Sequence, residues 1–242
     1  MSTKRYYVID YIRAFVILNM ILYHTIWDIV YIFNMDIYQF KDIQGKIWQR
    51  FICIAFILLC GFCWSLSKNH LKRGLITFAL GGAISIVTYI FVPENVIRYG
   101  ILTMLGSAIL IMIPLEKILN KVNEILGFVA SILLYVIFKD INNGYIFFSI
   151  VKVPKFLYSG EFMTYLGFME EGFYSSDYFS ILPWIFIFIG GYFLKVTAEK
   201  RNCMDMLKGV PNAFIEAVSR NSIYIYVIHQ PVIYGVLNLI LR

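Results

Sequence analysis

Seven apolar stretches divide this chain, and each is close to the length that crosses a lipid bilayer. A transmembrane helix needs about 20 apolar residues, with a range of roughly 17–25. Backbone polar groups in lipid must be hydrogen-bonded within the chain, and no strand-like alternation recurs, so helices are expected rather than a barrel. We therefore predict an all-α, polytopic transmembrane helix bundle of about seven spans: Tyr7–Phe33, Ile47–Ser67, Gly74–Val92, Tyr99–Leu119, Val122–Phe138, Ile181–Val196 and Ser222–Leu241. The fifth and sixth spans are short.

The composition supports lipid as the solvent of this bundle. Hydrophobic residues make up 60% of the 242 residues and charged residues only 15%, whereas soluble proteins have roughly 45–50% and about 25%. A net charge of +6 would suggest nucleic acid in a soluble protein. Here most charges lie in short loops between apolar stretches, where they indicate topology, so no nucleic-acid partner is expected. The positions of the four cysteines exclude a secreted disulfide scaffold.

The distribution of Lys and Arg predicts the orientation, because cytoplasmic loops carry an excess of both. One side of the predicted spans holds twelve: Lys4, Arg5, Lys68, Lys72, Arg73, Lys117, Lys121, Lys195, Lys200, Arg201, Lys208 and Arg220. The other side holds eight: Lys41, Lys46, Arg50, Arg98, Lys139, Lys152, Lys155 and Arg242. The N-terminus is therefore expected in the cytoplasm and the C-terminus outside, in a multi-pass protein of the plasma membrane.

We expect a single membrane-embedded domain over residues 1–242, with one long extracytoplasmic loop at about 139–180. Loops of this length in compact proteins are usually functional or disordered, and the aromatic content of this one favours an ordered cap. An apolar patch at 145–151 is too short to span and is expected to re-enter the membrane or to lie on its surface.

The first span carries four ionisable residues, each of which costs on the order of 2.5–3.5 kcal/mol at mid-membrane on insertion scales. At about 100° per residue, Asp10, Arg13, His24 and Asp28 fall on one stripe about 60° wide. Such a stripe must face the bundle and find partners there. It could be only an interhelical polar contact, with Asp10 and Arg13 as a simple i,i+3 pair at the membrane edge.

His24 and Asp28 have the one-turn spacing of a general base and the carboxylate that orients it. A second histidine, His229, lies in the last span next to Gln230 and Pro231. Pro231 removes a helix hydrogen bond, and Gln230 could satisfy either the freed carbonyl or a ligand. No metal is expected, because no close ligand spacing supports a site.

Other candidates leave two interpretations open. Arg50 opens the second span and either faces an anionic ligand or extends to the headgroups. Trp184 fits an interfacial aromatic belt as well as a substrate wall. The basic residues at the cytoplasmic span ends fit the positive-inside signature as well as a phosphate site.

The motifs of this chain resemble the catalytic-domain family of bacterial heparan-alpha-glucosaminide N-acetyltransferases. Members read roughly Asp-x-x-Arg-Gly, then Met, then His in the first helix, and Asp10, Arg13, Met20 and His24 match in order. The match continues through nearly the whole chain at Arg98-Tyr-Gly-Ile-Leu102, Ser176-Asp-Tyr-Phe179, Leu182-Pro-Trp184, Arg220-Asn-Ser222 and His229-Gln-Pro231. The Arg13–His24 spacing is also that of the broader transmembrane acyltransferase group that includes acyltransferase type 3. The chain departs from the usual Gly, His, Gly and His at Ala14, Thr103, Ser219 and Asn221.

The resemblance implies an acyltransferase that moves an acyl group, chiefly acetyl, from cytoplasmic acetyl-CoA to a hydroxyl or amine of an extracytoplasmic sugar or glycan. The implied catalytic set is His24, Asp28, Asp10 and Arg13, in which His24 is oriented by Asp28 and either deprotonates the acceptor or carries the acyl group transiently. His229 and Gln230 would donate to the thioester oxyanion. The acceptor-binding set would add Arg50, Arg98, Asp177 and Trp184, and the CoA phosphates would meet Lys72, Arg73, Arg201 and Arg220.

Two other functions remain compatible with the sequence. A small secondary transporter would also place ionisable residues on an inward stripe. A non-catalytic membrane scaffold would use the stripe only to hold helices together. The sequence also leaves a homo-oligomer open, because an apolar surface facing lipid looks like one facing a partner.

Overall fold

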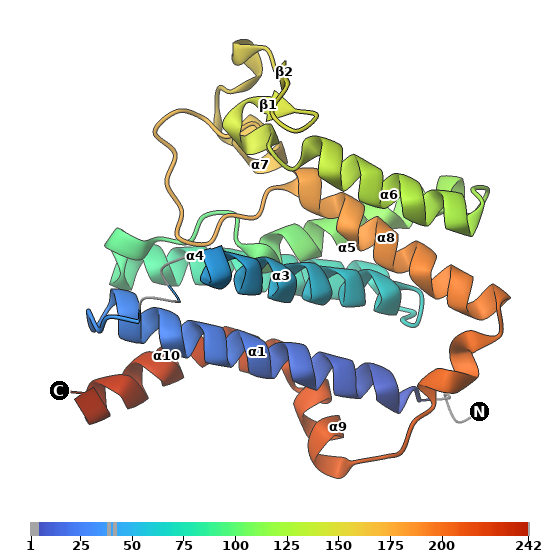
Figure 1. Cartoon of the computed structure of the whole chain (residues 1–242), viewed down its shortest axis with the longest axis horizontal. Helices are drawn as coiled ribbons and strands as arrows, with labels where there is room; N and C mark the ends of the chain where they lie inside the picture. The colour runs from blue at the N-terminus through green and yellow to red at the C-terminus, as the bar shows by residue number, and fades with distance from the viewer. Residues whose placement is uncertain (1–4, 38–39, 41–42, 242) are drawn as a thin grey trace. The chain divides into compact units, whose positions relative to one another are not determined.

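The computed structural model describes residues 5–37, residue 40 and residues 43–241, and it confirms the all-α bundle (Figure 1). The predicted spans correspond to helices α1 (Tyr7–Tyr31), α3 (Ile43–Trp64), α4 (His70–Phe91), α5 (Ile101–Leu119), α6 (Glu124–Phe138), α8 (Ile181–Lys200) and α10 (Ser222–Leu241). Lys4, Lys41 and Arg242, which enter the charge count, lie outside the described residues.

Six of these helices are long and apolar enough to cross a membrane: α1, α3, α4, α5, α8 and α10. α6 has 15 residues, about 22 Å at 1.5 Å per residue, and the hydrocarbon core of a bilayer is about 30 Å thick. The sequence indicated the shortness of this span. α8 runs to 20 residues, because its helix continues past Val196 into the polar end at Lys200.

Contacts between the α4–α5 connection and the segment before α8 show that the short helix α6 reverses the direction of the chain. The connection between α4 and α5 is hydrogen-bonded to the segment before α8: Arg98 N–H donates to Ser175 Oγ at 2.9 Å and Ser176 N–H donates to the Val96 carbonyl at 3.0 Å. α5 leads the chain away from that connection, so α6 must lead it back. Among the described residues six helices are long enough to cross, and a crossing by the short α6 stays a prediction.

The chain forms two compact units. The first contains residues up to 59 and from 201 onward, with α1, the start of α3, the 3-10 turn η4 (Cys203–Leu207), α9 (Ala213–Arg220) and α10. The second contains residues 60–200, with the end of α3, α4, the 3-10 turn η1 (Pro93–Asn95), α5, α6 and α8. The sequence analysis did not predict α9, which is short and strongly amphipathic.

The segment at 139–180, which we call the cap, belongs to the second unit and contains short regular elements. These are the turns η2 (Ile141–Asn143) and η3 (Lys155–Leu157), the strands β1 (Tyr145–Ile146) and β2 (Val151–Lys152), and helix α7 (Glu161–Leu166). The two strands form an antiparallel hairpin in which Tyr145 faces Lys152 and Ile146 faces Val151.

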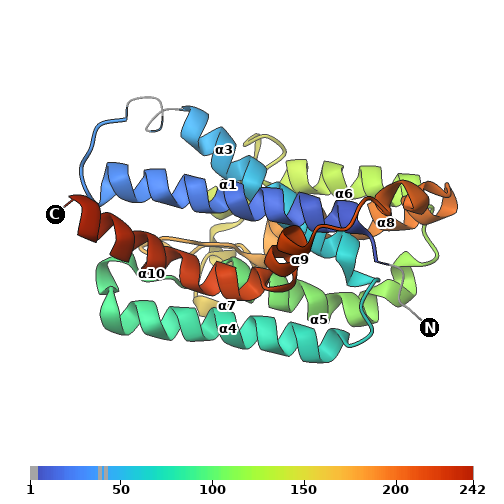
Figure 2. The ribbon, with the colours of Figure 1, turned by 90° about the horizontal axis from the view of Figure 1, so that it is seen from below.

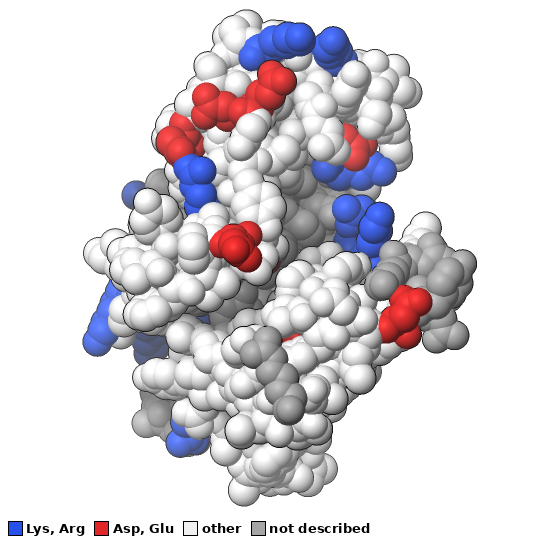
Figure 3. Space-filling model, turned by 90° about the vertical axis from the view of Figure 1, so that its left-hand side faces the viewer, with Lys and Arg blue, Asp and Glu red and all other residues white. Residues whose placement is uncertain are grey.

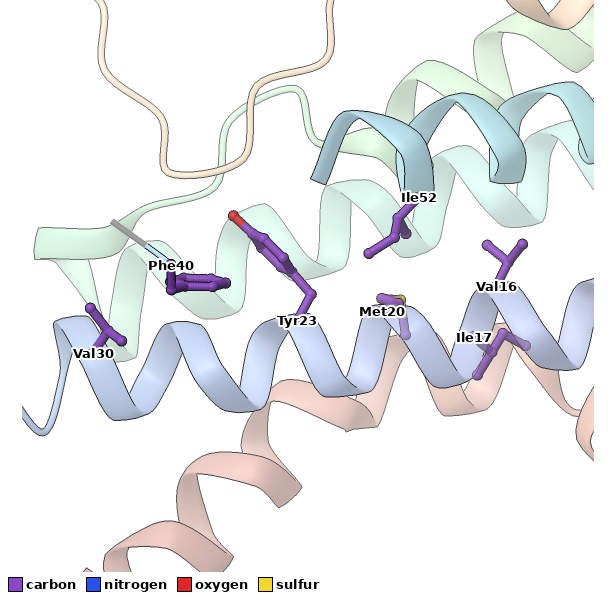
Figure 4. Packing of buried hydrophobic residues seen from close by; sticks show 7 residues of the cluster. All are labelled: Val16, Ile17, Met20, Tyr23, Val30, Phe40 and Ile52. Atoms are coloured by element: carbon purple, nitrogen blue, oxygen red, sulfur yellow. The ribbon is translucent and has the colours of Figure 1, made fainter. Parts of the chain in front are cut away.

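α1 supplies most of a hydrophobic cluster in the first unit (Figure 4). Val16, Met20 and Tyr23 recur at the three- and four-residue spacing of one helix face. Phe40 and Ile52 complete the cluster from the following segment and from α3. α10 runs beside α1 in the same unit (Figure 2). This packing fixes the rotation of α1 about its axis, and with it the direction in which the ionisable stripe faces.

Two glycines allow α4 and α5 to lie side by side in the second unit (Figure 2). A Cβ added at Gly81 would lie 2.4 Å from Thr103 Oγ1, and one added at Gly106 would lie 2.4 Å from the Phe78 amide nitrogen. Both distances are too short for a side chain. The two backbones therefore approach each other as helices do in membranes, where small residues form the interface.

The outer surface has the character of a lipid-facing protein. α4 exposes the large apolar side chains Ile86, Val87, Tyr89, Ile90 and Phe91, and soluble monomers rarely expose contiguous apolar patches of this kind. On the face drawn in Figure 3, charged side chains form a few small groups separated by wide uncharged areas. This distribution supports a multi-pass membrane protein.

Candidate active site

The ionisable stripe of α1 separates into two groups in the structure, and the first joins α1 to α9. Asp10 is 7% exposed; its Oδ2 accepts from Arg5 Nε at 2.8 Å and its Oδ1 accepts from Ser219 Oγ at 2.5 Å. Arg13 Nη1 donates to Ser219 Oγ at 2.6 Å and lies 3.8 Å from Asp10 Oδ1. Arg5 also pairs with Glu216 at 3.0 Å.

These contacts favour a structural role for Asp10 and Arg13. A buried carboxylate is tolerated when it is paired and hydrogen-bonded, and both oxygens of Asp10 have partners. The bridging hydroxyl belongs to Ser219, a position at which the resembling family usually has Gly. The network therefore holds the start of α1 against α9. A direct catalytic role for Asp10 and Arg13 stays a prediction.

The second group brings two histidines together across α1 and α10. The ring centroids of His24 and His229 lie 4.8 Å apart in an edge-to-face arrangement. His229 Nδ1 is 2.5 Å from the Tyr226 carbonyl oxygen. Because a carbonyl only accepts, Nδ1 carries the proton in the neutral ring and Nε2 keeps its lone pair.

This tautomer changes the role expected for His229. His229 Nε2 is buried and has no hydrogen-bond partner among the described residues. In the neutral ring that atom accepts a proton and does not donate one, so neutral His229 cannot be the oxyanion donor that the sequence analysis expected. It is instead a second candidate base next to His24.

Asp28 is bound to α10 and not to His24. Its side chain is fully buried, and its Oδ1 accepts from Gln230 Nε2 at 2.6 Å. Among the described residues, no hydrogen bond joins His24 to Asp28. The expected orientation of His24 by Asp28 is thus replaced by an Asp28–Gln230 contact, since the long amide of the facing helix reaches the short carboxylate. Gln230 Nε2 thus donates to Asp28 and not to the backbone carbonyl that Pro231 leaves without a helix hydrogen bond.

Three buried polar atoms of this group lack partners among the described residues: Asp28 Oδ2, His229 Nε2 and Gln230 Oε1. Buried polar atoms are nearly always hydrogen-bonded, to protein or to another polar molecule. Within the part of the chain that the structure describes, the ring of His24 contacts the rings of Tyr23 and His229. We call these four residues, His24, Asp28, His229 and Gln230, the histidine cluster. It can accept protons and bind a polar ligand.

The predicted cationic residues lie on exposed surfaces of both units. Arg50, Arg201 and Arg220 are exposed in the first unit, and Lys72 and Arg73 are exposed on the first turn of α4 in the second. Exposed cations at helix ends suit lipid headgroups as well as a soluble anion. Their role toward CoA stays a prediction.

In the second unit, Arg98 is the centre of a polar and aromatic group on the cap side. Its guanidinium forms an ion pair with Glu161 and lies 4.6 Å from the ring centroid of Phe173. Tyr99 Oη donates to Glu161 Oε2 at 2.8 Å. This hydrogen bond, with the neighbouring Arg98, holds the pKa of Glu161 below its ordinary value. Nothing in the sequence spacing pairs Glu161 with Arg98, so this contact was not predicted.

Trp184 and Asp177 are half-buried in the second unit. The Trp184 ring packs against Phe179 and Tyr135, with centroids 5.0 and 5.5 Å away. Asp177 accepts a hydrogen bond from Ile101 N–H, at the first turn of α5, where a carboxylate is favoured by the helix dipole. Burial of this carboxyl nevertheless raises its pKa from 3.8 to about 6.

The raised pKa of Asp177 makes the stability of the cap dependent on pH. The folded state binds the proton more tightly than the unfolded chain, so this contribution is complete below pH 3.8 and is lost as the pH rises through about 6. It amounts to at most about 3 kcal/mol, at about 1.4 kcal/mol for each pH unit between the two values. Asp177→Asn should remove this dependence while preserving an oxygen that accepts from Ile101.

Thermal unfolding of both proteins between pH 5 and pH 8 measures this effect. The wild type should lose stability relative to Asp177→Asn as the pH rises, whereas the exposed control Glu171→Gln should follow the wild type. Parallel curves for the wild type and Asp177→Asn would show that the carboxyl titrates in both states alike.

No group of three or more His, Cys, Asp and Glu side chains that could hold a metal occurs among residues 5–37, 40 and 43–241.

Comparison with known proteins identifies the family. The family model described as "Heparan-alpha-glucosaminide N-acetyltransferase, catalytic" matches residues 5–231, which include the whole histidine cluster and the Arg98 group. No curated protein and no solved structure matches the chain. The chain therefore belongs to the heparan-alpha-glucosaminide N-acetyltransferase catalytic family, a family of membrane acetyltransferases.

Proposed function

We propose that this protein transfers an acetyl group from cytoplasmic acetyl-CoA to an amine or hydroxyl of an extracytoplasmic sugar or glycan. The observation that carries the proposal is the half-buried histidine pair of α1 and α10, whose His24 and His229 ring centroids lie 4.8 Å apart, in a chain of an acetyltransferase family. In this proposal the whole chain acts as one acyltransferase domain in the plasma membrane.

The proposed chemistry needs a base and a site for a polar carbonyl. His24 takes the proton of the acceptor hydroxyl or ammonium group, and the freed oxygen or nitrogen attacks the thioester carbonyl. The C–S bond then breaks, and the CoA sulfur leaves with the proton that His24 returns. His229 Nε2, whose lone pair is free in the neutral ring, is the second acceptor of protons. The remaining amide hydrogen of Gln230 is the group that would donate to the thioester oxygen.

The two substrates are assigned to opposite sides of the membrane. The side rich in Lys and Arg would be cytoplasmic and would present Lys72, Arg73, Arg201 and Arg220 to the CoA phosphates. The cap side would be extracytoplasmic. There Arg98, Asp177 and Trp184, together with Glu161 and Phe173, would contact the sugar, because carboxylates and aromatic faces suit a polar ring with apolar faces.

Binding of the donor is the first test, because it needs no knowledge of the acceptor. Acetyl-CoA at 100 times its dissociation constant should stabilise the detergent-purified protein by about 2.7 kcal/mol. For a chain of 242 residues this corresponds to a rise in Tm of roughly 5–11 °C. Free CoA should also stabilise, and ATP, which shares the adenine and phosphates, serves as the control.

The pattern of stabilisation by the three ligands tests the proposed donor site, which neither the transporter nor the scaffold alternative requires. A shift with acetyl-CoA and CoA but not with ATP supports a donor site and leads to a screen of amino sugars with radiolabelled acetyl-CoA. Equal shifts with all three would indicate nonspecific anion binding to exposed cations. Absence of a shift at millimolar ligand would contradict the proposed donor.

A further inference from the structure

The cap hairpin, residues 145–152, exposes an apolar tip that the proposed reaction does not use. Between β1 and β2, Phe148 is 61% exposed and Ile150 is 79% exposed. Phe147, Phe148 and Ser149 all have positive φ, between 52° and 64°, a conformation that costs roughly 1–2 kcal/mol for each residue with a Cβ. In water, this tip would combine backbone strain with exposed aromatic surface.

The hairpin is attached firmly to the end of α6. Phe147 N–H donates to the Ile137 carbonyl in the last turn of α6 at 2.9 Å. Ser149 Oγ donates to Asp140 Oδ2 at 3.1 Å, and Lys139 Nζ lies 5.2 Å from the centroid of the Phe148 ring. The position of the tip is therefore set by the end of α6.

The lipid-facing surface of α6 continues into this tip. Leu126, Val129 and Leu133 are exposed along one side of α6, and α6 ends after only 15 residues. In Figures 1 and 2 the hairpin lies level with the middle of α4 along the direction of the helices, and not beyond the end of α4. α4 is one of the apolar helices long enough to cross the membrane. The tip thus lies at a depth that a bilayer covers.

The charges beside the tip belong to long side chains. Lys139, Lys152 and Lys155 are exposed around it, against one carboxylate at Asp140. Long lysine side chains extend from an apolar region toward phosphate groups. An apolar tip flanked by cations, with Lys139 over the Phe148 ring, is the arrangement of an element that enters a leaflet.

From this placement we infer that the hairpin tip, Phe147–Ile150, inserts into the leaflet on the cap side and holds the cap at the membrane surface. The occupant of the exposed apolar surface is therefore lipid. The inference depends on the membrane crossing of α6 and not on acetyl transfer, so the two can fail separately.

Depth-dependent quenching in nanodiscs tests the insertion on the full chain. A small fluorescent amino acid is placed at Ile150, and a matched probe is placed at Glu171, an exposed residue of the same cap outside the hairpin. Lipids brominated on their acyl chains should quench the Ile150 probe at least threefold more than the Glu171 probe. Aqueous iodide should show the reverse order.

A substitution at Phe148 tests whether quenching of the probe depends on the apolar tip and not on the probe itself. Phe148→Asp in the Ile150-probe protein removes apolar surface from an exposed position, so the fold should persist while quenching by brominated lipid falls at least twofold. An Ile150 probe that iodide quenches as strongly as the Glu171 probe would overturn the inference. A probe shielded from both quenchers, as a second copy of the chain would shield it, would overturn it as well.

Discussion

His24→Ala should lower acetyl transfer by about 10²–10⁴-fold, the contribution of a positioned general base. His24 lies at the centre of the histidine cluster, its ring contacting Tyr23 and His229. Its replacement removes the base without removing the Asp28–Gln230 hydrogen bond that joins the same two helices. The stabilisation by acetyl-CoA should therefore remain while the rate of transfer, measured with radiolabelled donor, is lost.

Thr25→Val is the matched control for His24→Ala. Thr25 is the next residue on α1, and its hydroxyl donates to the Ile21 carbonyl of its own helix, at 2.8 Å. Valine preserves the shape of the side chain, so the variant should transfer acetyl at nearly the rate of the wild type. Full activity of His24→Ala in the same assay would exclude His24 as the base and direct attention to His229.

The fold was largely predictable because bilayer thickness imposes one length on every span. Span boundaries read from hydropathy agree with the helices to within a few residues, and α10 begins and ends where predicted. The short helices α7 and α9 were missed, because neither has an apolar run of membrane length. α9 is held by Asp10, Arg13 and Ser219, contacts that no local pattern could indicate.

The candidate site was predictable in its residues but not in its pairing. Charges in an apolar span identified His24 and Asp28, since ionisable groups in lipid are costly and need partners. Helical spacing then suggested that the two pair with each other. The structure gives the carboxylate to Gln230 instead. Spacing on one helix cannot show which side chain of a facing helix will form the hydrogen bond. Gln230 is 202 positions away from Asp28.

The cap shows the same limit more strongly. The ion pair of Arg98 with Glu161 joins residues 63 positions apart, and the contact of Asp177 with Ile101 joins a loop to a helix start. Each contact depends on how the chain folds back after α6. The sequence predicts on which side of the membrane each loop lies, but not which loops touch. Long-range polar pairs of this kind had to come from the structure.

Gly61→Val should produce the largest loss of stability, because this glycine of α3 lies directly against the backbone of α8. A Cβ added at Gly61 would lie 2.0 Å from the Phe188 carbonyl oxygen, a rigid group that cannot move without shifting α8. Overpacking typically costs about 1–3 kcal/mol and occasionally more, which for a chain of this size lowers Tm by roughly 2–12 °C.

Gly82→Ala is the matched control, since a Cβ at Gly82 on α4 would meet nothing within 4 Å. Alanine in an open helix interior should stabilise by about 0.5–1 kcal/mol, so the two substitutions should move Tm in opposite directions in thermal unfolding of the detergent-purified protein. A loss at Gly61 no greater than the change at Gly82 would show that α3 and α8 do not approach as closely as the structure has them. Opposite signs would support a second unit in which helices make backbone contact at glycine. Such packing suits lipid, because water supplies no hydrophobic driving force between helices there and close approach takes its place.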